Sequence, residues 1–196
     1  EHMNTALIDN ISHNLRLFCE WTQVPCISRN TEDFLIPLLE KYKPQHILEI
    51  GTAYGYSLLT IGRTVAKWWG NIIGCERAYP NWVEIQKLLA LSKYYGMHNL
   101  ECLYGPFLSF TPNQFQTQTK VFDFVFIDAQ KSEYPNYIDY LIDNKLIDDK
   151  TILLFDDVIK YQDKIIWLTE SLKAYGYQYE LHQLDSDDGV LIAQKE

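Results

Sequence analysis

The sequence has no apolar run that approaches the roughly 20 residues needed to cross a bilayer, so we expect no membrane association. Its first residues also lack the basic-then-apolar layout of a signal peptide. Cysteine is scarce, with 4 residues in 196, and no two of them have the CxxC spacing of a redox or zinc motif. We therefore expect reduced, mostly buried thiols in a cytoplasmic protein.

Basic residues are also few. Lys and Arg number 17 against 26 Asp and Glu, for a net charge of -9. Broad contact with nucleic-acid phosphates needs a basic surface, so this balance argues against it without excluding a small local patch. The apolar fraction of 47% is that of a globular protein. The length predicts one domain over residues 4–196, and residues 1–3 look like a cloning remnant that ends at the native Met3.

Short β-type runs alternate with helix-length segments along the chain. The expected strands are His46–Ile50, Asn71–Glu76, Leu100–Tyr104, Phe122–Asp128, Thr151–Phe155, Gln178–Leu184 and Gly189–Ala193. The expected helices are Thr31–Lys41, with Asn30 or Thr31 as its cap, Ser57–Trp68, Trp82–Tyr95, Tyr134–Asn144 and Gln162–Tyr175. This alternation predicts an α/β doubly wound fold, with a mostly parallel sheet between helices and a C-terminal hairpin that adds one antiparallel strand at an edge.

A glycine-rich turn follows the first strand. Gly51 and Gly55 allow a tight turn and close approach of a ligand, and Ser57 opens a helix whose N-terminal amides favour an anion. The spacing G-x-x-x-G differs from the dinucleotide pattern, so the turn alone is a weak signal and could be purely structural. Glu76 ends the second strand, where a carboxylate can hold a ribose diol. Together they favour an adenosine-type cofactor.

Carboxylates end the fourth and fifth strands. Asp128 follows the one, and Asp156 and Asp157 follow the other. If these strands are neighbours, three anions meet at one point and would repel unless a hard divalent cation such as Mg²⁺ or Ca²⁺ joins them. The lack of His or Cys beside them argues against zinc. The alternative is that Asp157 faces solvent and Asp128 caps a helix.

Lys131 lies three residues beyond Asp128. A divalent ion beside it would disfavour the ammonium and lower its pKa, so that the neutral amine could act as a general base. The alternative is a solvated surface lysine.

Four segments together resemble the cation-dependent, S-adenosyl-L-methionine (SAM)-dependent O-methyltransferase family, which includes catechol, caffeoyl-CoA and bacterial enzymes. LEIGTAYGYS resembles the cofactor motif of that family, FDFVFIDAQKSEY and TILLFDDV its two metal motifs, and DDGVLIAQK its terminal strand. The resemblance runs from about Val24 to the C-terminus. It implies a Rossmann-like class I methyltransferase fold, with a seven-stranded, mostly parallel sheet, an antiparallel C-terminal strand and helices on both faces.

The resemblance also assigns roles. It implies that SAM contacts Gly51, Tyr54, Gly55 and Ser57, with Glu49 beneath the turn, Glu76 on the ribose, Asp128 beside the cofactor and Ile27 in a segment that closes over it. Mg²⁺, or another divalent ion such as Ca²⁺ or Mn²⁺, would be held by Asp128, Asp156 and Asp157, with Lys131 as the base. Relatives are often homodimers, which makes a homodimer an expectation here.

The sequence also departs from the family. Asp157 stands where the family usually has Asn, and Pro106 interrupts a Gly-Asp-Ala stretch of bacterial members, which puts the adenine contacts in doubt. The long insertion that roofs the substrate pocket of larger relatives is missing, so specificity transfers least.

The expected reaction is methyl transfer to a metal-chelated hydroxyl of a catechol-like small molecule. An alternative substrate is the 5-hydroxyuridine at a tRNA wobble position, because Val24-Pro25 resembles a branch that acts on it. A non-catalytic SAM-binding module is disfavoured by the complete set Asp128, Lys131 and Asp156. A nicotinamide-dependent oxidoreductase is disfavoured by the missing G-x-G-x-x-G.

Overall fold

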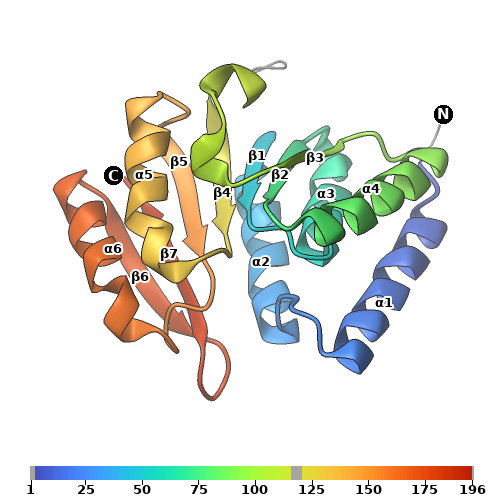
Figure 1. Cartoon of the computed structure of the whole chain (residues 1–196), viewed down its shortest axis with the longest axis horizontal. Helices are drawn as coiled ribbons and strands as arrows, with labels where there is room; N and C mark the ends of the chain where they lie inside the picture. Colours follow the sequence, from blue (N-terminus) through green and yellow to red (C-terminus); the bar gives the residue numbers. More distant parts are fainter. Residues whose placement is uncertain (1–2, 116–120, 196) are drawn as a thin grey trace.

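One seven-stranded sheet forms the centre of the molecule, with helices on both faces (Figure 1). This computed structural model describes residues 3–115 and 121–195, so Glu1 and His2 of the expected cloning remnant lie outside the described residues. The strands are β1 (His46–Ile50), β2 (Asn71–Glu76), β3 (Leu100–Tyr104), β4 (Phe122–Ile127), β5 (Ile147–Phe155), β6 (Gln178–Gln183) and β7 (Gly189–Gln194).

The α-helices are α1 (Thr5–Thr22), α2 (Arg29–Tyr42), α3 (Tyr56–Val65), α4 (Tyr79–Tyr94), α5 (Tyr134–Asp143) and α6 (Gln162–Ala174). Five were predicted within a few residues of their bounds, but α1 was missed. The cap of α2 was also predicted wrongly: the side chain of Ser28, and not that of Asn30 or Thr31, accepts from the backbone N–H of Thr31.

The strand order is β3-β2-β1-β4-β5-β7-β6. The first five of these strands pair in parallel, and β7 pairs antiparallel with β5 on one side and with β6 on the other. The antiparallel strand therefore lies one position in from the edge, between β5 and the edge strand β6. The chain reverses its direction of winding between β1 and β4, and crevices for ligands form at such switch points.

Each face of the sheet buries its own apolar layer. On one face, strand residues such as Val125 and Leu153 pack with α5 and α6; on the other, Phe124 and Leu154 pack with α2, α3 and α4. Helix α1 packs outside α3, where Ile8 meets Leu59. Because both faces are covered, the central strands are almost fully apolar, as the sequence predicts.

The register brings the ends of four strands to one edge. Ile50 of β1 lies beside Cys75 of β2 and Ile127 of β4, and Ile127 lies beside Phe155 of β5. Backbone bonds continue this alignment past the strands: the N–H of Asp128 donates to the carbonyl of Ile50 at 2.9 Å. The residues that follow β1, β2, β4 and β5 therefore meet in space.

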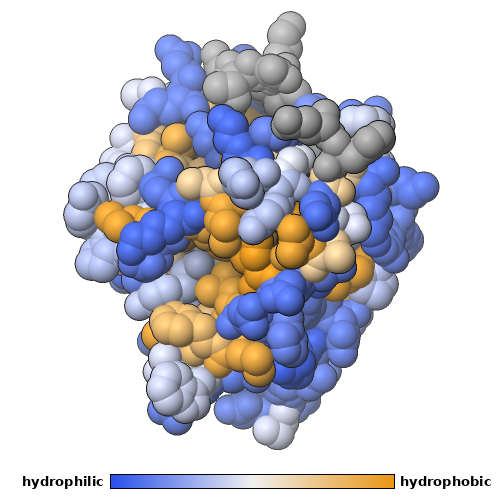
Figure 2. Space-filling view, turned by 90° about the vertical axis from the view of Figure 1, so that its right-hand side faces the viewer, coloured by the Kyte–Doolittle hydropathy of each residue, from blue (hydrophilic) through white to orange (hydrophobic). Residues whose placement is uncertain are grey.

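Among the described residues, no helix is long and apolar enough to cross a membrane. Figure 2 shows the face that carries α1 and α4, where apolar side chains gather between polar ones. The exposed apolar side chains of α1 are Leu7, Leu17, Phe18 and Trp21.

Candidate active site

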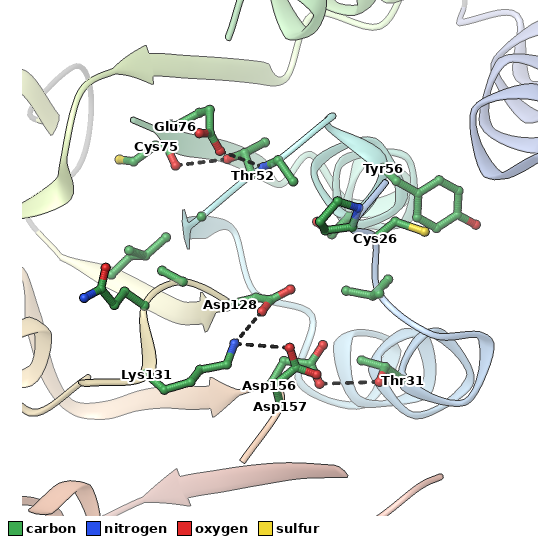
Figure 3. Close-up of a pocket in the computed structure, with 18 of the residues that line it drawn as sticks. Cys26, Thr31, Thr52, Tyr56, Cys75, Glu76, Asp128, Lys131, Asp156 and Asp157 are labelled. Carbon is green, nitrogen blue, oxygen red and sulfur yellow. Dashed lines mark hydrogen bonds and ion pairs between the residues drawn. The ribbon is translucent and has the colours of Figure 1, made fainter. Parts of the chain in front are cut away.

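A pocket of about 780 Å³ opens at the edge where the ends of β1, β2, β4 and β5 meet. Its wall includes Gly51 after β1, Glu76 at the end of β2, Asp128 after β4 and Asp156 after β5. A volume of this size accommodates a cofactor together with a small substrate. The pocket lies at the switch point between β1 and β4, as the sequence predicts (Figure 3).

Gly51 makes the turn that opens the pocket. Its φ is +89°, and a Cβ at this position would lie 2.2 Å from the carbonyl oxygen of Asp128. Gly55 also has a left-handed φ, +87°, and stands at the N-cap of α3 without a side-chain cap bond. Because glycine has no side chain that could accept from them, the first backbone amides of α3 can donate to an anion. Ser57, in the first turn of α3, lines the pocket.

Glu49 lies fully buried beneath this turn, as expected from the resemblance. Neither carboxylate oxygen has a hydrogen-bond partner in the described part of the chain. The pKa of Glu49 is raised to about 8, above all by burial and also by the charges of Asp128 and Glu76, against the lowering effect of the nearby hydroxyls of Ser57 and Thr52. The hydroxyl of Thr52 donates to the carbonyl of Cys75 at 3.4 Å.

Glu76 is buried and held on both sides. One carboxylate oxygen accepts the backbone N–H of Ala53 at 2.8 Å, and the other accepts that of Ala78 at 2.7 Å. Each oxygen keeps a second lone pair, so the oriented carboxylate can still accept from a diol in the pocket. The sequence predicted this position but not the two backbone contacts.

Ile27 and Tyr54, both expected near the cofactor, differ in their position relative to the pocket. Ile27 is 3% exposed and lines the pocket, as expected. Tyr54 does not line it: its ring lies 6.0 Å from that of Phe18 in α1. Gly55 is likewise outside the wall of the pocket, and the contacts of Tyr54 and Gly55 with SAM stay predictions.

Asp128, Asp156 and Asp157 all reach the same pocket, as the strand order requires. Asp128 and Asp157 are joined through Lys131, whose Nζ lies 2.9 Å from Oδ1 of Asp128 and 3.2 Å from Oδ2 of Asp157. Within residues 3–115 and 121–195, no three His, Cys, Asp or Glu side chains are arranged as a metal site. The alternative in which Asp157 faces solvent is partly right, since its side chain is 45% exposed.

Asp156 is the buried member of the group, at 4% exposed. Burial raises its pKa well above the usual range, and the charges of Asp128 and Asp157 raise it further. The hydroxyl of Thr31 in α2 donates to Oδ1 of Asp156 at 3.4 Å. From the sequence, Thr31 was expected only as a possible cap, because a contact across 125 positions leaves no local signal.

Lys131 is a pocket residue and not a solvated one: its side chain is 11% exposed. Burial lowers its pKa, but the charges of Asp128 and Asp157 outweigh burial, so the pKa is raised above its usual value. The expectation of a lowered pKa rested on a neighbouring cation, whereas here the two carboxylates surround the ammonium. The ring of Tyr134 lies 5.4 Å from Nζ of Lys131. The hydroxyl of Tyr134 donates to the carbonyl of Asp156 at 3.1 Å and so joins Tyr134, beside Lys131, to the end of β5.

The loop between β6 and β7 also reaches the pocket, through residues 185–188. Asp185 accepts the hydroxyl of Ser28 at 2.7 Å, which ties this loop to the start of α2. The sequence predicts only a hairpin here, since nothing local indicates that the loop reaches the pocket at the ends of β4 and β5.

A model of the family described as O-methyltransferase matches residues 10–189. The chain belongs to the O-methyltransferase family. The fold agrees: an O-methyltransferase from Bacillus cereus, solved in complex with S-adenosylhomocysteine, superposes with a TM-score of 0.78 at 19% identity, over 94% of this chain and 90% of that one.

Two curated members of this family have similar sequences. O-methyltransferase hkm8 of Aspergillus hancockii is 30% identical over 59% of this chain and 43% of its own length. Catechol O-methyltransferase of Niastella koreensis is 27% identical over 68% of this chain and 58% of its own length. The chain spans about half the length of these relatives.

Proposed function

We propose that this chain transfers a methyl group from SAM to a metal-chelated hydroxyl of a catechol-like small molecule. The observation that carries the proposal is that a single pocket contains the glycine turn, Glu76 and the set Asp128, Lys131 and Asp156. A protein that only binds a cofactor has no need for the last three.

The residues around the glycine turn fit SAM. The carboxylate of Glu49, fully buried beneath the turn, places a titratable group under the expected position of the cationic methionine moiety, whose charge would favour the ionised form of Glu49. The free amides of α3 suit the carboxylate of that moiety, and Glu76 suits the ribose hydroxyls. The Bacillus cereus relative was solved with the product form of this cofactor.

The donor chemistry of Asp128, Asp156 and Asp157 fits a hard divalent ion such as Mg²⁺, since all three offer carboxylate oxygens and two of them raise the pKa of the third. Such an ion would polarise the substrate hydroxyl and stabilise its ionised form. Lys131 would then lose the two carboxylate partners that raise its pKa, and its Nζ would accept the hydroxyl proton. The rest of the site positions donor and acceptor in line.

The charge of the pocket favours a small substrate over tRNA. Its wall carries two basic side chains, Arg77 and Lys131. Eight acidic side chains surround them: Glu76, Asp128, Glu133, Asp156, Asp157, Asp185, Asp187 and Asp188. A polyphosphate backbone would be repelled at this wall, whereas an uncharged catechol would not.

Calorimetric titration tests the proposal in three steps: SAM alone, then catechol without Mg²⁺, then catechol with Mg²⁺ and detection of the methylated product by mass. We expect SAM to bind, and catechol to bind and react only with the metal. Asp156→Asn should remove the catechol step and keep SAM binding, while the exposed control Asp149→Asn changes neither. A protein that binds no SAM would overturn the proposal, and one that binds SAM but never catechol would leave tRNA as the substrate to test.

A further inference from the structure

A buried arginine lies behind one wall of the pocket. Arg16 is in the second half of α1, on the face of the helix that also buries Ile8, Ser12 and Cys19. It is 4% exposed. A guanidinium in such a place loses most of its water, and proteins bury this charge where several partners accept from it. The partners of Arg16 therefore indicate its role.

The first contacts of Arg16 are with the wall segment, residues 25–28, which precedes α2. Its Nη1 donates to the carbonyl of Ile27 and, at 3.4 Å, to Sγ of Cys26. Both residues line the pocket. The side chain of Ile27 packs into the apolar layer on this face of the sheet, so Arg16 holds the backbone of a residue whose side chain is packed as well. These two contacts fix where the wall segment lies.

The same guanidinium also holds the start of α3. Its Nη2 pairs with Oε2 of Glu32 at 2.7 Å, and the hydroxyl of Tyr56 donates to that oxygen, also at 2.7 Å. The guanidinium lies over the ring of Tyr56, 4.0 Å from its centre. Tyr56 is the first residue of α3 and lines the pocket beside Cys26 (Figure 3). Arg16 therefore joins the wall segment to the helix whose first amides are proposed to face the cofactor carboxylate.

Arg63 of α3 belongs to the same group of charges but not to the wall. Its Nη2 lies 3.5 Å from Oε1 of Glu32, and its Nη1 pairs with Asp9 of α1 at 2.7 Å. In the described part of the chain, these ion pairs do not reach the wall segment, and Arg63 does not line the pocket. It is therefore a matched comparison for Arg16, because it shares Glu32 but lacks the contact with Ile27.

We propose that Arg16 is a positioning residue of the cofactor pocket. Arg16 itself does not line the pocket, so it acts through Ile27 and Tyr56, which do. Without its guanidinium, the wall segment and the start of α3 are no longer joined, and the cofactor binds more weakly. This inference rests on the proposed function, because it takes this part of the pocket to be the SAM site.

The shape of the guanidinium matters for this role, since one group donates in two directions. Nη1 bonds the carbonyl of Ile27 while Nη2 bonds Glu32. A lysine ammonium keeps the charge and can pair with Glu32, but its donors radiate from one nitrogen and do not reproduce the planar fork. Arg16→Lys therefore removes the hold on the wall segment and keeps the buried charge pair.

The first test measures S-adenosylhomocysteine binding by calorimetry, and then methyl transfer. We expect Arg16→Lys to bind S-adenosylhomocysteine at least about fivefold more weakly, and the KM for SAM to rise by a similar factor. The kcat at saturating SAM should stay within about twofold, because the groups around Lys131 are unchanged. Arg63→Gln should lose stability in denaturant unfolding and keep its affinity within about twofold. A purely structural role would instead make affinity follow stability in both variants.

Limited digestion with trypsin reports on the wall segment without any cofactor. Arg29 directly follows this segment, is exposed, and is a cleavage site for trypsin. Cleavage after it needs local opening of the chain on both sides. We expect this cleavage, followed by peptide mass, to be at least about fivefold faster in Arg16→Lys and unchanged in Arg63→Gln.

Normal affinity in Arg16→Lys, an equal loss in Arg63→Gln, or unchanged cleavage after Arg29 would overturn the inference. If Arg16→Lys does not fold, the double variant Arg16→Gln with Glu32→Gln takes its place, because it buries no unpaired charge. If the wild type binds no S-adenosylhomocysteine, the proposed function fails, while the digestion still decides whether Arg16 holds the wall segment.

Discussion

At the scale of single residues, the site depends on ionisable groups whose charges are set by burial. Glu49 has no hydrogen-bond partner in the described chain and a pKa of about 8. Lys131 is held as an ammonium by two carboxylates. The raised pKa of Glu49 and the ion pairs of Lys131 exist only in the folded protein. Substitution of either residue should therefore change a measurable property.

Glu49→Gln should change how stability depends on pH. Because its folded pKa lies above its ordinary value of 4.5, the folded protein keeps a proton that the unfolded chain has lost. The contribution of Glu49 to the free energy of unfolding of the cofactor-free wild type therefore falls as pH rises from about 4.5 to about 8. The fall is up to ~1.4 kcal/mol per pH unit. The variant should lack this loss, as measured by denaturant unfolding at both pH values.

The same variant should bind SAM more weakly, by about 10-fold, because the cationic cofactor loses the favourable charge of the carboxylate buried beneath the glycine turn. A variant that is destabilised equally at low and high pH and binds SAM normally would show that Glu49 is only a packing residue.

Lys131→Gln should lower kcat for methyl transfer by about 10²- to 10⁴-fold, the usual contribution of a general base. SAM affinity should stay within about twofold, because no cofactor contact is lost, and isothermal calorimetry measures it. The matched control is Lys67→Gln, since Lys67 pairs with Glu40 at the surface and does not line the pocket. An unchanged kcat would exclude Lys131 as the base.

At the scale of elements, the glycine turn between β1 and α3 couples the cofactor side of the pocket to the carboxylate side. Gly51 and Gly176 both have left-handed φ, but only at Gly51 would a Cβ meet another group, the carbonyl of Asp128. Gly176→Ala should cost about 1–2 kcal/mol of stability from backbone strain alone. Gly51→Ala carries the same strain plus this clash.

Denaturant unfolding of the two alanine variants separates these contributions. We expect Gly51→Ala to be less stable than Gly176→Ala by at least about 2 kcal/mol, and to bind SAM more weakly. Equal stabilities would mean that the turn can relax away from Asp128, and that the two sides of the pocket are not coupled through it.

At the scale of the whole molecule, charge separates the two candidate substrates. With a net charge of -9, the chain should turn over a catechol at nearly the same rate in about 50 and about 200 mM salt, since no phosphate contact is screened. A tRNA substrate would give activity that falls steeply over this range. Steady-state rates at the two salt concentrations decide between them.

The homodimer expected from the resemblance also belongs to this scale, and it stays a prediction. The exposed apolar side chains of α1 are candidates for the surface that a second copy covers. Light scattering across a dilution series measures the assembly state directly.

The local sequence determined the sheet and most of the helices, because apolar runs, turn glycines and helical periodicity are short-range signals. It also determined that Gly51, Glu76, Asp128 and Asp156 lie at or just after the ends of strands, and parallel strands bring such residues to one edge. The fold class and most of the pocket wall were therefore predictable. Helix α1 was missed because no comparable pattern was recognised in residues 5–22.

Only the tertiary structure decided the contacts between these residues. The cap at Ser28, the bond from Thr31 to Asp156 and the ring of Tyr54 against Phe18 join distant segments. The protonation states of Glu49 and Lys131 also depend on burial and on charges brought close by folding. Sequence spacing specifies which element a side chain belongs to, whereas desolvation and Coulomb interaction depend on distances across the fold.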